Sequence, residues 1–184
     1  MRITGGAARG IRLTAPRGLA TRPATDALRE ALFSRLGPAI VGARAIDLFA
    51  GTGAYGLEAL SRGAAQVTFV ESAKLALSAL RANLAAVERA CGGSLEATVQ
   101  AADVFRWPSP EALPDILIAD PPYELLRLKA DALAAKLEHL SGDDTVIALE
   151  APGNIAAPAG FTCERRLGKT GDGPSLLLLR RIRG

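Results

Sequence analysis

Residues that form disulfides and metal sites are scarce in this sequence. Its 184 residues include two cysteines and one histidine. Cys91 and Cys163 lie far apart, and neither has a Cys or His neighbour at the spacing of metal ligands. This scarcity excludes a disulfide-stapled or zinc-stapled small domain. We expect two free thiols in a reducing compartment and no bound metal.

Aromatic residues and long apolar runs are also lacking. Only 4% of the residues are aromatic although 49% are hydrophobic, so the core must be built from Ala, Leu, Val and Ile. No apolar run approaches the length of a membrane span, and residues 1–6 lack the apolar stretch of a secretory leader. We therefore expect a compact, monomeric, cytoplasmic protein that does not enter a membrane.

Positive charge is concentrated near the N-terminus. Of 22 basic and 19 acidic residues, seven arginines and two acids lie in residues 1–35, which leaves 15 basic and 17 acidic residues for the rest. Residues 1–22, rich in Gly, Arg and Pro with short β-type stretches, predict a small hairpin or extended arm outside the main core. Arginine suits phosphate contacts and stacking on bases, so we predict an RNA-contacting arm, although a merely solvated Arg-rich segment has the same composition. The arginines predicted to hold phosphates are Arg2, Arg9, Arg12, Arg22 and Arg29.

Residues 23–184 predict one α/β domain. A helix begins at Thr25-Asp26 and ends before Gly37-Pro38, with an apolar stripe along one face. Predicted strands then alternate with helices, and the strands cover about 45–50, 66–71, 95–100, 115–120 and 145–149, with a helix over 125–140. Two last strand-like runs, 161–166 and 175–181, lie close enough to pair antiparallel. This order predicts a doubly wound, mostly parallel, seven-stranded Rossmann-like sheet with its ligand site beyond the carboxyl ends of the strands.

A glycine-rich turn follows the first predicted strand and opens a helix. Its sequence is Gly51-Thr52-Gly53-Ala54-Tyr55-Gly56, which allows the backbone to turn tightly and to approach a ligand. Glu71 ends the next strand, where a carboxylate can accept hydrogen bonds from both ribose hydroxyls. Together these features indicate an adenosine-containing cofactor, and they leave NAD and S-adenosylmethionine both open.

Asp47, inside the first strand, favours S-adenosylmethionine. A carboxylate would repel a pyrophosphate, whereas it attracts an ammonium or a sulfonium group. Asp103, after the third strand, is placed to accept from the adenine amino group, although an ordinary surface aspartate is an equally good interpretation. The predicted cofactor-binding residues are Asp47, Phe49, Gly51, Thr52, Gly53, Glu71, Asp103 and Val104.

Asp120-Pro121-Pro122-Tyr123 ends the fourth predicted strand, at the same edge of the sheet as the glycine turn. An exocyclic amine of a base is a poor nucleophile because its lone pair is delocalised into the ring. Hydrogen bonds from its two N–H groups to the Asp120 carboxylate and the Pro121 carbonyl would aim that lone pair at a methyl group. Tyr123 can stack on the base, which has to leave any helical stack. We predict Asp120, Pro121 and Tyr123 as the catalytic residues.

With these motifs the chain resembles the RsmD family of 16S ribosomal RNA guanine-N2 methyltransferases over nearly its full length. The matching segments are Arg2-Ile3-Thr4-Gly5-Gly6 with Arg9-Gly10, Arg22-Pro23-Ala24-Thr25-Asp26 with Arg29-Glu30, Asp47-Leu48-Phe49-Ala50-Gly51-Thr52-Gly53, Gly56-Leu57-Glu58-Ala59-Leu60-Ser61-Arg62-Gly63, and Asp120-Pro121-Pro122-Tyr123. The resemblance implies methylation of one guanine in 16S rRNA or the assembling small subunit, with the arm helping to hold the RNA. Two places depart from the family: Ala73 stands where a second acid is common, and Lys169–Gly173 lacks a Tyr-Gly pair.

Other functions fit parts of the same pattern. A DNA or RNA adenine-N6 methyltransferase would use the same two motifs, because adenine also has an exocyclic amine. A non-catalytic RNA-binding ribosome-assembly factor could retain the fold. An NAD-dependent oxidoreductase would explain neither Asp47 nor the Asp-Pro-Pro-Tyr turn.

Overall fold

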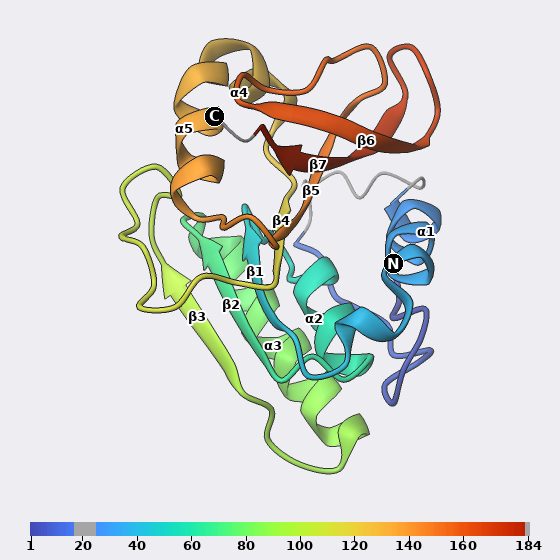
Figure 1. The fold of residues 1–184 in the computed structure, drawn as a ribbon. Coiled ribbons are helices and arrows are strands. Elements are labelled where there is room, and N and C mark those ends of the chain that lie inside the picture. The colour runs from blue at the N-terminus through green and yellow to red at the C-terminus, as the bar shows by residue number, and fades with distance from the viewer. Residues whose placement is uncertain (17–24, 183–184) are drawn as a thin grey trace.

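The computed structural model describes residues 1–16 and 25–182 (Figure 1). Its helices are α1 (Thr25–Leu36), the short 3-10 helix η1 (Gly37–Ile40), α2 (Ala54–Ser61), α3 (Lys74–Cys91), α4 (Tyr123–Leu128) and α5 (Ala130–His139). Its strands are β1 (Arg44–Leu48), β2 (Gln66–Glu71), β3 (Ala97–Ala101), β4 (Ile116–Ala119), β5 (Val146–Pro152), β6 (Phe161–Gly168) and β7 (Pro174–Arg181). Among these described residues, no helix has the length and apolar character needed to cross a membrane.

The seven strands form one sheet in the order β3-β2-β1-β4-β5-β7-β6. Strands β3, β2, β1, β4 and β5 are parallel to one another, whereas β7 lies antiparallel to both β5 and β6. This confirms the predicted mostly parallel sheet and its antiparallel last pair. Strand β1 pairs with β2 on one side and with β4 on the other, where Leu48 lies opposite Val70 and Ala119. From β1 the chain continues outward to β2 and β3 and then returns to β4, so the order of the strands reverses between β1 and β4. A sheet of this kind binds its ligand at that point.

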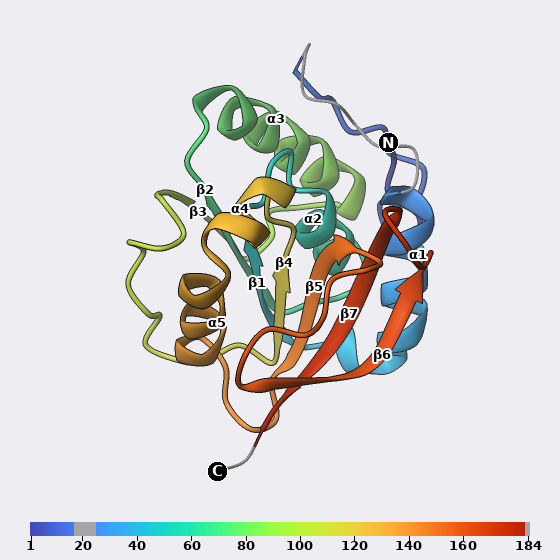
Figure 2. The ribbon, with the colours of Figure 1, turned by 90° about the horizontal axis from the view of Figure 1, so that it is seen from above.

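Helices cover both faces of the sheet. Helices α1, α2 and α3 lie on one side, and α4 and α5 lie on the other (Figure 2). Each face has its own apolar core, and alternate residues of β1 enter the two cores, with Ala45 in one and both Ile46 and Leu48 in the other. A parallel strand buried on both faces consists of nearly continuous apolar residues, as β4 does, whereas β1 also buries Asp47.

The N-terminal arm packs on the domain. An antiparallel bridge pairs Arg2 with Arg12, which confirms the predicted hairpin. However, Ile3, Ala8 and Leu13 are buried in the same core as α1, α2 and α3. The prediction that this segment lies outside the main core is therefore wrong for its apolar side chains, because burial of Ile3 and of Leu13 gains roughly 1.5–3 kcal/mol each over exposure.

The helix predicted over 125–140 is two helices. The chain leaves the helical region at Lys129, which has a φ of −133° and lies between the end of α4 and the start of α5 at Ala130. Periodicity alone did not reveal the break, because Leu126, Leu133 and Leu137 are all buried in the same core. The break places Lys129 at the edge of the candidate active site.

Candidate active site

A cavity of about 540 Å³ lies at the carboxyl ends of β1, β2, β3 and β4. This volume is in the range of small-molecule and cofactor sites. Eight of the residues predicted as catalytic or cofactor-binding line it: Asp47, Phe49, Gly51, Thr52, Glu71, Asp103, Val104 and Asp120; Arg29, predicted to hold phosphate, lines it as well. Three others predicted for the site do not line it: Gly53, Pro121 and Tyr123.

The turn after β1 has a left-handed backbone at three of its residues. Phe49, Gly51 and Gly53 have φ values of 57°, 55° and 82°. For Phe49 this conformation costs on the order of 1–3 kcal/mol, and such strain is concentrated at functional sites. A side chain at Gly53 would place its Cβ 2.2 Å from Cδ1 of Leu80 in α3. Gly53 therefore permits the turn to pack on α3, and the contact with the cavity is made by its neighbours.

Glu71 is held rigidly by backbone donors. Its carboxylate accepts hydrogen bonds of 2.8 Å from the N–H of Gly51 and of 2.7 Å from those of Ser72 and Ala73. A carboxylate has about four acceptor positions, so about one stays open towards the cavity. These bonds fix the orientation of the carboxylate, and the expectation that Glu71 accepts from both ribose hydroxyls stays a prediction. Ala73, where a second acid was expected, contributes its backbone N–H to this arrangement.

Asp47 is a buried carboxylate at the centre of the site. Its side chain accepts a hydrogen bond of 2.8 Å from the N–H of Gly56 in α2, and the residue is 2% exposed. Burial raises the pKa of Asp47 well above its ordinary value; the Gly56 hydrogen bond opposes this, and the charges of Asp120 and Glu71 add to it. Because the Asp47, Glu71, Asp103 and Asp120 carboxylates line one cavity, a positively charged ligand there would be stabilised electrostatically.

An aromatic pair forms another part of the wall. The rings of Phe49 and Phe105 meet edge to face with centroids 5.9 Å apart, and the Lys129 Nζ lies 4.7 Å from the Phe105 centroid. Asp103 accepts a hydrogen bond of 2.7 Å from the Phe105 N–H, which fixes its carboxylate beside these rings. This is a suitable surface for a flat heteroaromatic ring with an amino group. No sequence pattern indicated Phe105 or Lys129, because only the fold brings them to the glycine turn.

At the end of β4 the cavity wall is formed by Asp120, Pro122 and Leu125. Tyr123 instead packs against the core on the α4 and α5 side of the sheet. Tyr123 therefore does not line the cavity as Pro122 and Leu125 do, and its predicted stacking on a base stays a prediction. Residues 169–173, which depart from the family pattern, lie between β6 and β7 and do not line the cavity.

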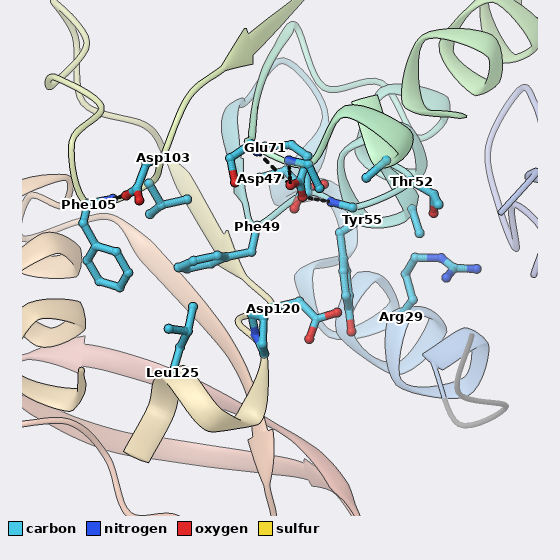
Figure 3. Close-up of a pocket in the computed structure, with 18 of the residues that line it drawn as sticks. Arg29, Asp47, Phe49, Thr52, Tyr55, Glu71, Asp103, Phe105, Asp120 and Leu125 are labelled. Atoms are coloured by element: carbon cyan, nitrogen blue, oxygen red, sulfur yellow. Dashed lines mark hydrogen bonds between the residues drawn. The ribbon is translucent and has the colours of Figure 1, made fainter. Parts of the chain in front are cut away.

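Tyr55 and Glu150 form a buried pair that sequence reasoning missed. The Tyr55 hydroxyl donates a hydrogen bond of 2.7 Å to Glu150 Oε2, and the two residues are 5% and 1% exposed. Tyr55 lines the cavity, and Figure 3 shows the Asp120 carboxylate pointing toward its hydroxyl end. The one available signal was an acidic residue in the otherwise apolar strand β5.

The predicted phosphate-binding arginines divide into two groups. Arg2, Arg9 and Arg12 are exposed, as a contact with RNA requires, whereas Arg22 lies outside the described residues. The prediction for Arg29 needs correction. Its side chain is fully buried, and Figure 3 shows the guanidinium turned away from Asp120.

Arg29 contacts protein groups instead of solvent. Its guanidinium lies 3.1 Å from Glu58 and 2.9 Å from Asp26, and it donates to the backbone carbonyl of Arg2. Glu58 also accepts hydrogen bonds from the N–H and hydroxyl of Thr4. Arg29 therefore fastens the arm to α2, because its buried guanidinium already binds Glu58, Asp26 and the Arg2 carbonyl and does not reach solvent.

Comparisons with known proteins agree with one another. The family described as Conserved hypothetical protein 95 matches residues 1–173. Ribosomal RNA small subunit methyltransferase D of Escherichia coli (strain K12) is 40% identical over 124 residues, 67% of this chain and 60% of that protein. The relative of that name in Haemophilus influenzae (strain Rd) is 33% identical over 123 residues, 67% of this chain and 64% of that protein. A solved structure of a hypothetical protein from Thermus thermophilus covers 99% of each chain with 30% identity and a TM-score of 0.75.

Proposed function

The chain belongs to the family described as Conserved hypothetical protein 95, and from that premise we propose that it transfers a methyl group from S-adenosylmethionine to N2 of a guanine in small-subunit ribosomal RNA. Methylation of this RNA is supported by the relatives named ribosomal RNA small subunit methyltransferase D. The base and atom are supported by the motif at the end of β4 and by the resemblance to the RsmD family.

The group of carboxylates around one cavity is the observation that supports S-adenosylmethionine as the cofactor. Asp47, Glu71 and Asp120 lie close enough that the charges of the latter two raise the pKa of Asp47, after the larger effect of its burial. A pyrophosphate would add negative charge to this group, whereas the ammonium and sulfonium of S-adenosylmethionine would offset it. The residues present therefore fit this cofactor, which when bound supplies an electrophilic methyl group.

Each part of the cofactor has residues suited to hold it. We assign its ammonium to Asp47 and its ribose to the open acceptor position of Glu71. Its adenine would lie against Phe49 and Phe105, with the amino group donating to Asp103. Val104 and the Gly51-Thr52 backbone complete this half of the wall.

The acceptor half of the cavity suits an exocyclic amine. We assign to the Asp120 carboxylate and the Pro121 carbonyl the two N–H groups of that amine, which localises the nitrogen lone pair for attack. Pro122 and Leu125 give this part of the wall an apolar surface on which the base can pack, and a bound base would cover it from water. Oriented acceptors of this kind contribute most where water is excluded.

The arm is assigned to the RNA. Arg2, Arg9 and Arg12 are exposed on a hairpin fixed to α1 and α2, so they can contact phosphates next to the cavity. We expect the N-terminal arm, 1–22, to bind RNA and residues 23–184 to bind the cofactor. We also expect one copy of the chain to act in the cytoplasm on 16S rRNA or on the assembling subunit.

The test is to identify the methylated nucleoside. Small subunits from cells that lack this protein are incubated with the protein and radiolabelled S-adenosylmethionine, and the RNA is digested to nucleosides. The expected product is labelled N2-methylguanosine. Labelled N6-methyladenosine instead would assign the protein to the adenine enzymes. No label, together with no calorimetric binding of the cofactor, would indicate a non-catalytic assembly factor.

A further inference from the structure

We infer that Tyr55, held by Glu150, accepts the ring N–H next to the methylated amine, so that the pair distinguishes guanine from bases that lack this proton. The inference rests on the proposed function, which assigns the amine to Asp120. It adds Tyr55 as a residue that contacts the ring of the base. The roles assigned to the glycine turn and to the Asp-Pro-Pro-Tyr motif do not include this contact.

The first step is the state of the Tyr55 hydroxyl. A phenol has one proton to donate and lone pairs that accept. The proton is directed at Glu150 Oε2, at 2.7 Å, and hydrogen bonds to carboxylates are among the strong ones in proteins. Burial, followed by the charges of Glu150 and Asp120, raises the pKa of Tyr55 well above its ordinary value. The hydroxyl therefore stays protonated, and only its lone pairs are available to the cavity.

The second step is the position of Glu150. In the register of β4 with β5, Ala119 lies opposite Leu149, so Asp120 and Glu150 are the next residues of two adjacent parallel strands. Helix α2 places Tyr55 above this edge, where its ring lines the cavity. The Asp120 carboxylate points toward the hydroxyl end of Tyr55 (Figure 3). Two acceptors, one from Asp120 and one from Tyr55, thus face the same part of the cavity.

Two neighbouring acceptors select two neighbouring donors. Guanine has an N1–H directly beside its N2 amine, so it can donate to both residues. Adenine and 2-aminopurine have an amine beside a ring nitrogen that carries a lone pair. That lone pair would face the Tyr55 oxygen without a proton between them. A site whose acceptor is placed for a donor on the base binds an analogue without that donor more weakly, here by about 10- to 100-fold.

The first test compares two conservative variants with a matched control. Tyr55→Phe keeps the ring and removes the acceptor, and Glu150→Gln keeps the shape and can donate to Tyr55, which frees the hydroxyl proton to turn into the cavity. Both should lower kcat/KM on unmethylated small subunits by about 10-fold or more, with the affinity for S-adenosylmethionine unchanged. The control is Glu164→Gln, an exposed carboxylate on β6, which should keep the wild-type rate.

The second test measures base selection directly. Five-nucleotide RNAs with uridines around a central guanine, 2-aminopurine or adenine are titrated into each protein with S-adenosylhomocysteine present. Wild type should prefer guanine over 2-aminopurine by about 10-fold or more, Tyr55→Phe should lose the preference, and Glu150→Gln should shift it toward 2-aminopurine. A purely structural role would lower the melting temperature without changing this ratio.

The outcomes separate the inference from the function on which it rests. If wild type forms no N2-methylguanosine, the proposed function fails. If wild type forms it and Tyr55→Phe forms it at the same kcat/KM, only the role of Tyr55 is overturned. The role is also overturned if wild type binds the guanine and 2-aminopurine RNAs equally, including no binding to either.

Discussion

Arg29 and Glu58 form an ion pair whose two side chains are both fully buried, 3.1 Å apart. The pair joins α1 to α2, and through Thr4 and Arg2 it holds the arm. It links the part of the chain predicted to hold RNA to the helix that follows the glycine turn.

Removing one partner of this pair should destabilise the fold. Arg29→Met should lower the free energy of unfolding by about 1.5–3 kcal/mol, because the buried Glu58 carboxylate would lose the charged hydrogen bond from Arg29 and keep only its ion pair with Arg62. Urea unfolding measures this. Arg44→Met is the matched control, since Arg44 and Asp115 form a half-exposed pair at 3.8 Å whose loss should cost at most about 1 kcal/mol. Equal losses in both variants would contradict the structural role of Arg29.

The same network predicts a dependence of stability on pH. Burial raises the pKa of Glu58, but hydrogen bonds from Thr4, Arg62 and Arg29 outweigh it and lower the pKa overall. A group whose pKa is lower in the folded state stabilises it at pH above the unfolded pKa, and that contribution disappears as the pH falls through the folded pKa. Unfolding at acidic pH should therefore be less pH-dependent in Glu58→Gln than in wild type. The same slope in both would contradict this assignment.

Alanine substitutions at Gly53 and Gly92 separate the cost of backbone strain from the cost of a steric clash. Both have a left-handed backbone, at φ of 82° and 85°, but an added Cβ would meet Leu80 at Gly53 and nothing within 4 Å at Gly92. Gly92→Ala should cost roughly 1–2 kcal/mol from strain alone. Gly53→Ala should cost more and also weaken cofactor binding, measured by urea unfolding and calorimetry. Equal costs with unchanged binding would mean that the turn adapts to the side chain.

Asp47→Asn should weaken S-adenosylmethionine binding by about 10- to 100-fold, because the amide keeps an acceptor for Gly56 but loses the charge that attracts the ammonium. Calorimetry measures this, with the exposed Asp115→Asn as control. In wild type the affinity should fall as the pH drops through the raised pKa of Asp47, since protonation removes its charge. The Asn variant should lack this dependence, and a wild-type affinity independent of pH would argue against the contact.

At Asp120 the two substitutions should differ. Asp120→Asn keeps an acceptor for the amine and should retain appreciable activity, whereas Asp120→Ala should lose about 100-fold or more in kcat. Rates on small subunits at saturating cofactor measure both. If Asn proves as inactive as Ala, Asp120 removes a proton as a true base and does more than orient the amine.

Arg9 and Arg12 should contribute electrostatically to RNA binding. Replacing each by Gln should reduce the slope of log affinity against log salt by about 0.7–0.9 per lost phosphate contact, with cofactor binding unchanged. Arg89→Gln, an exposed arginine on α3, is the control and should leave the slope as it is. If Arg9→Gln and Arg12→Gln also leave it unchanged, the arm has a structural role only.

Most of the fold was predictable because its signals are local. Strand β2 begins and ends where its alternating apolar residues predicted, and the glycine turn lies between β1 and α2 as its residues required. The break at Lys129 was not predictable, since the apolar spacing continues across it. Of the site, Asp47, Glu71 and Asp120 could be placed at one sheet edge because carboxyl ends of parallel strands meet there. Phe105 could not, because it follows β3 in a loop.

The sequence by itself determined the order of elements, the sheet edge that carries the cavity and the negative charge that suits a cationic cofactor. These follow from periodicity, from backbone preferences and from residue type at strand ends, all of which act over a few residues. The tertiary structure alone decided that Arg29 is buried and that Tyr55 meets Glu150, 95 residues away. Such pairs depend on how helices and strands pack side by side, and no local pattern encodes which of several acidic residues a buried donor will meet.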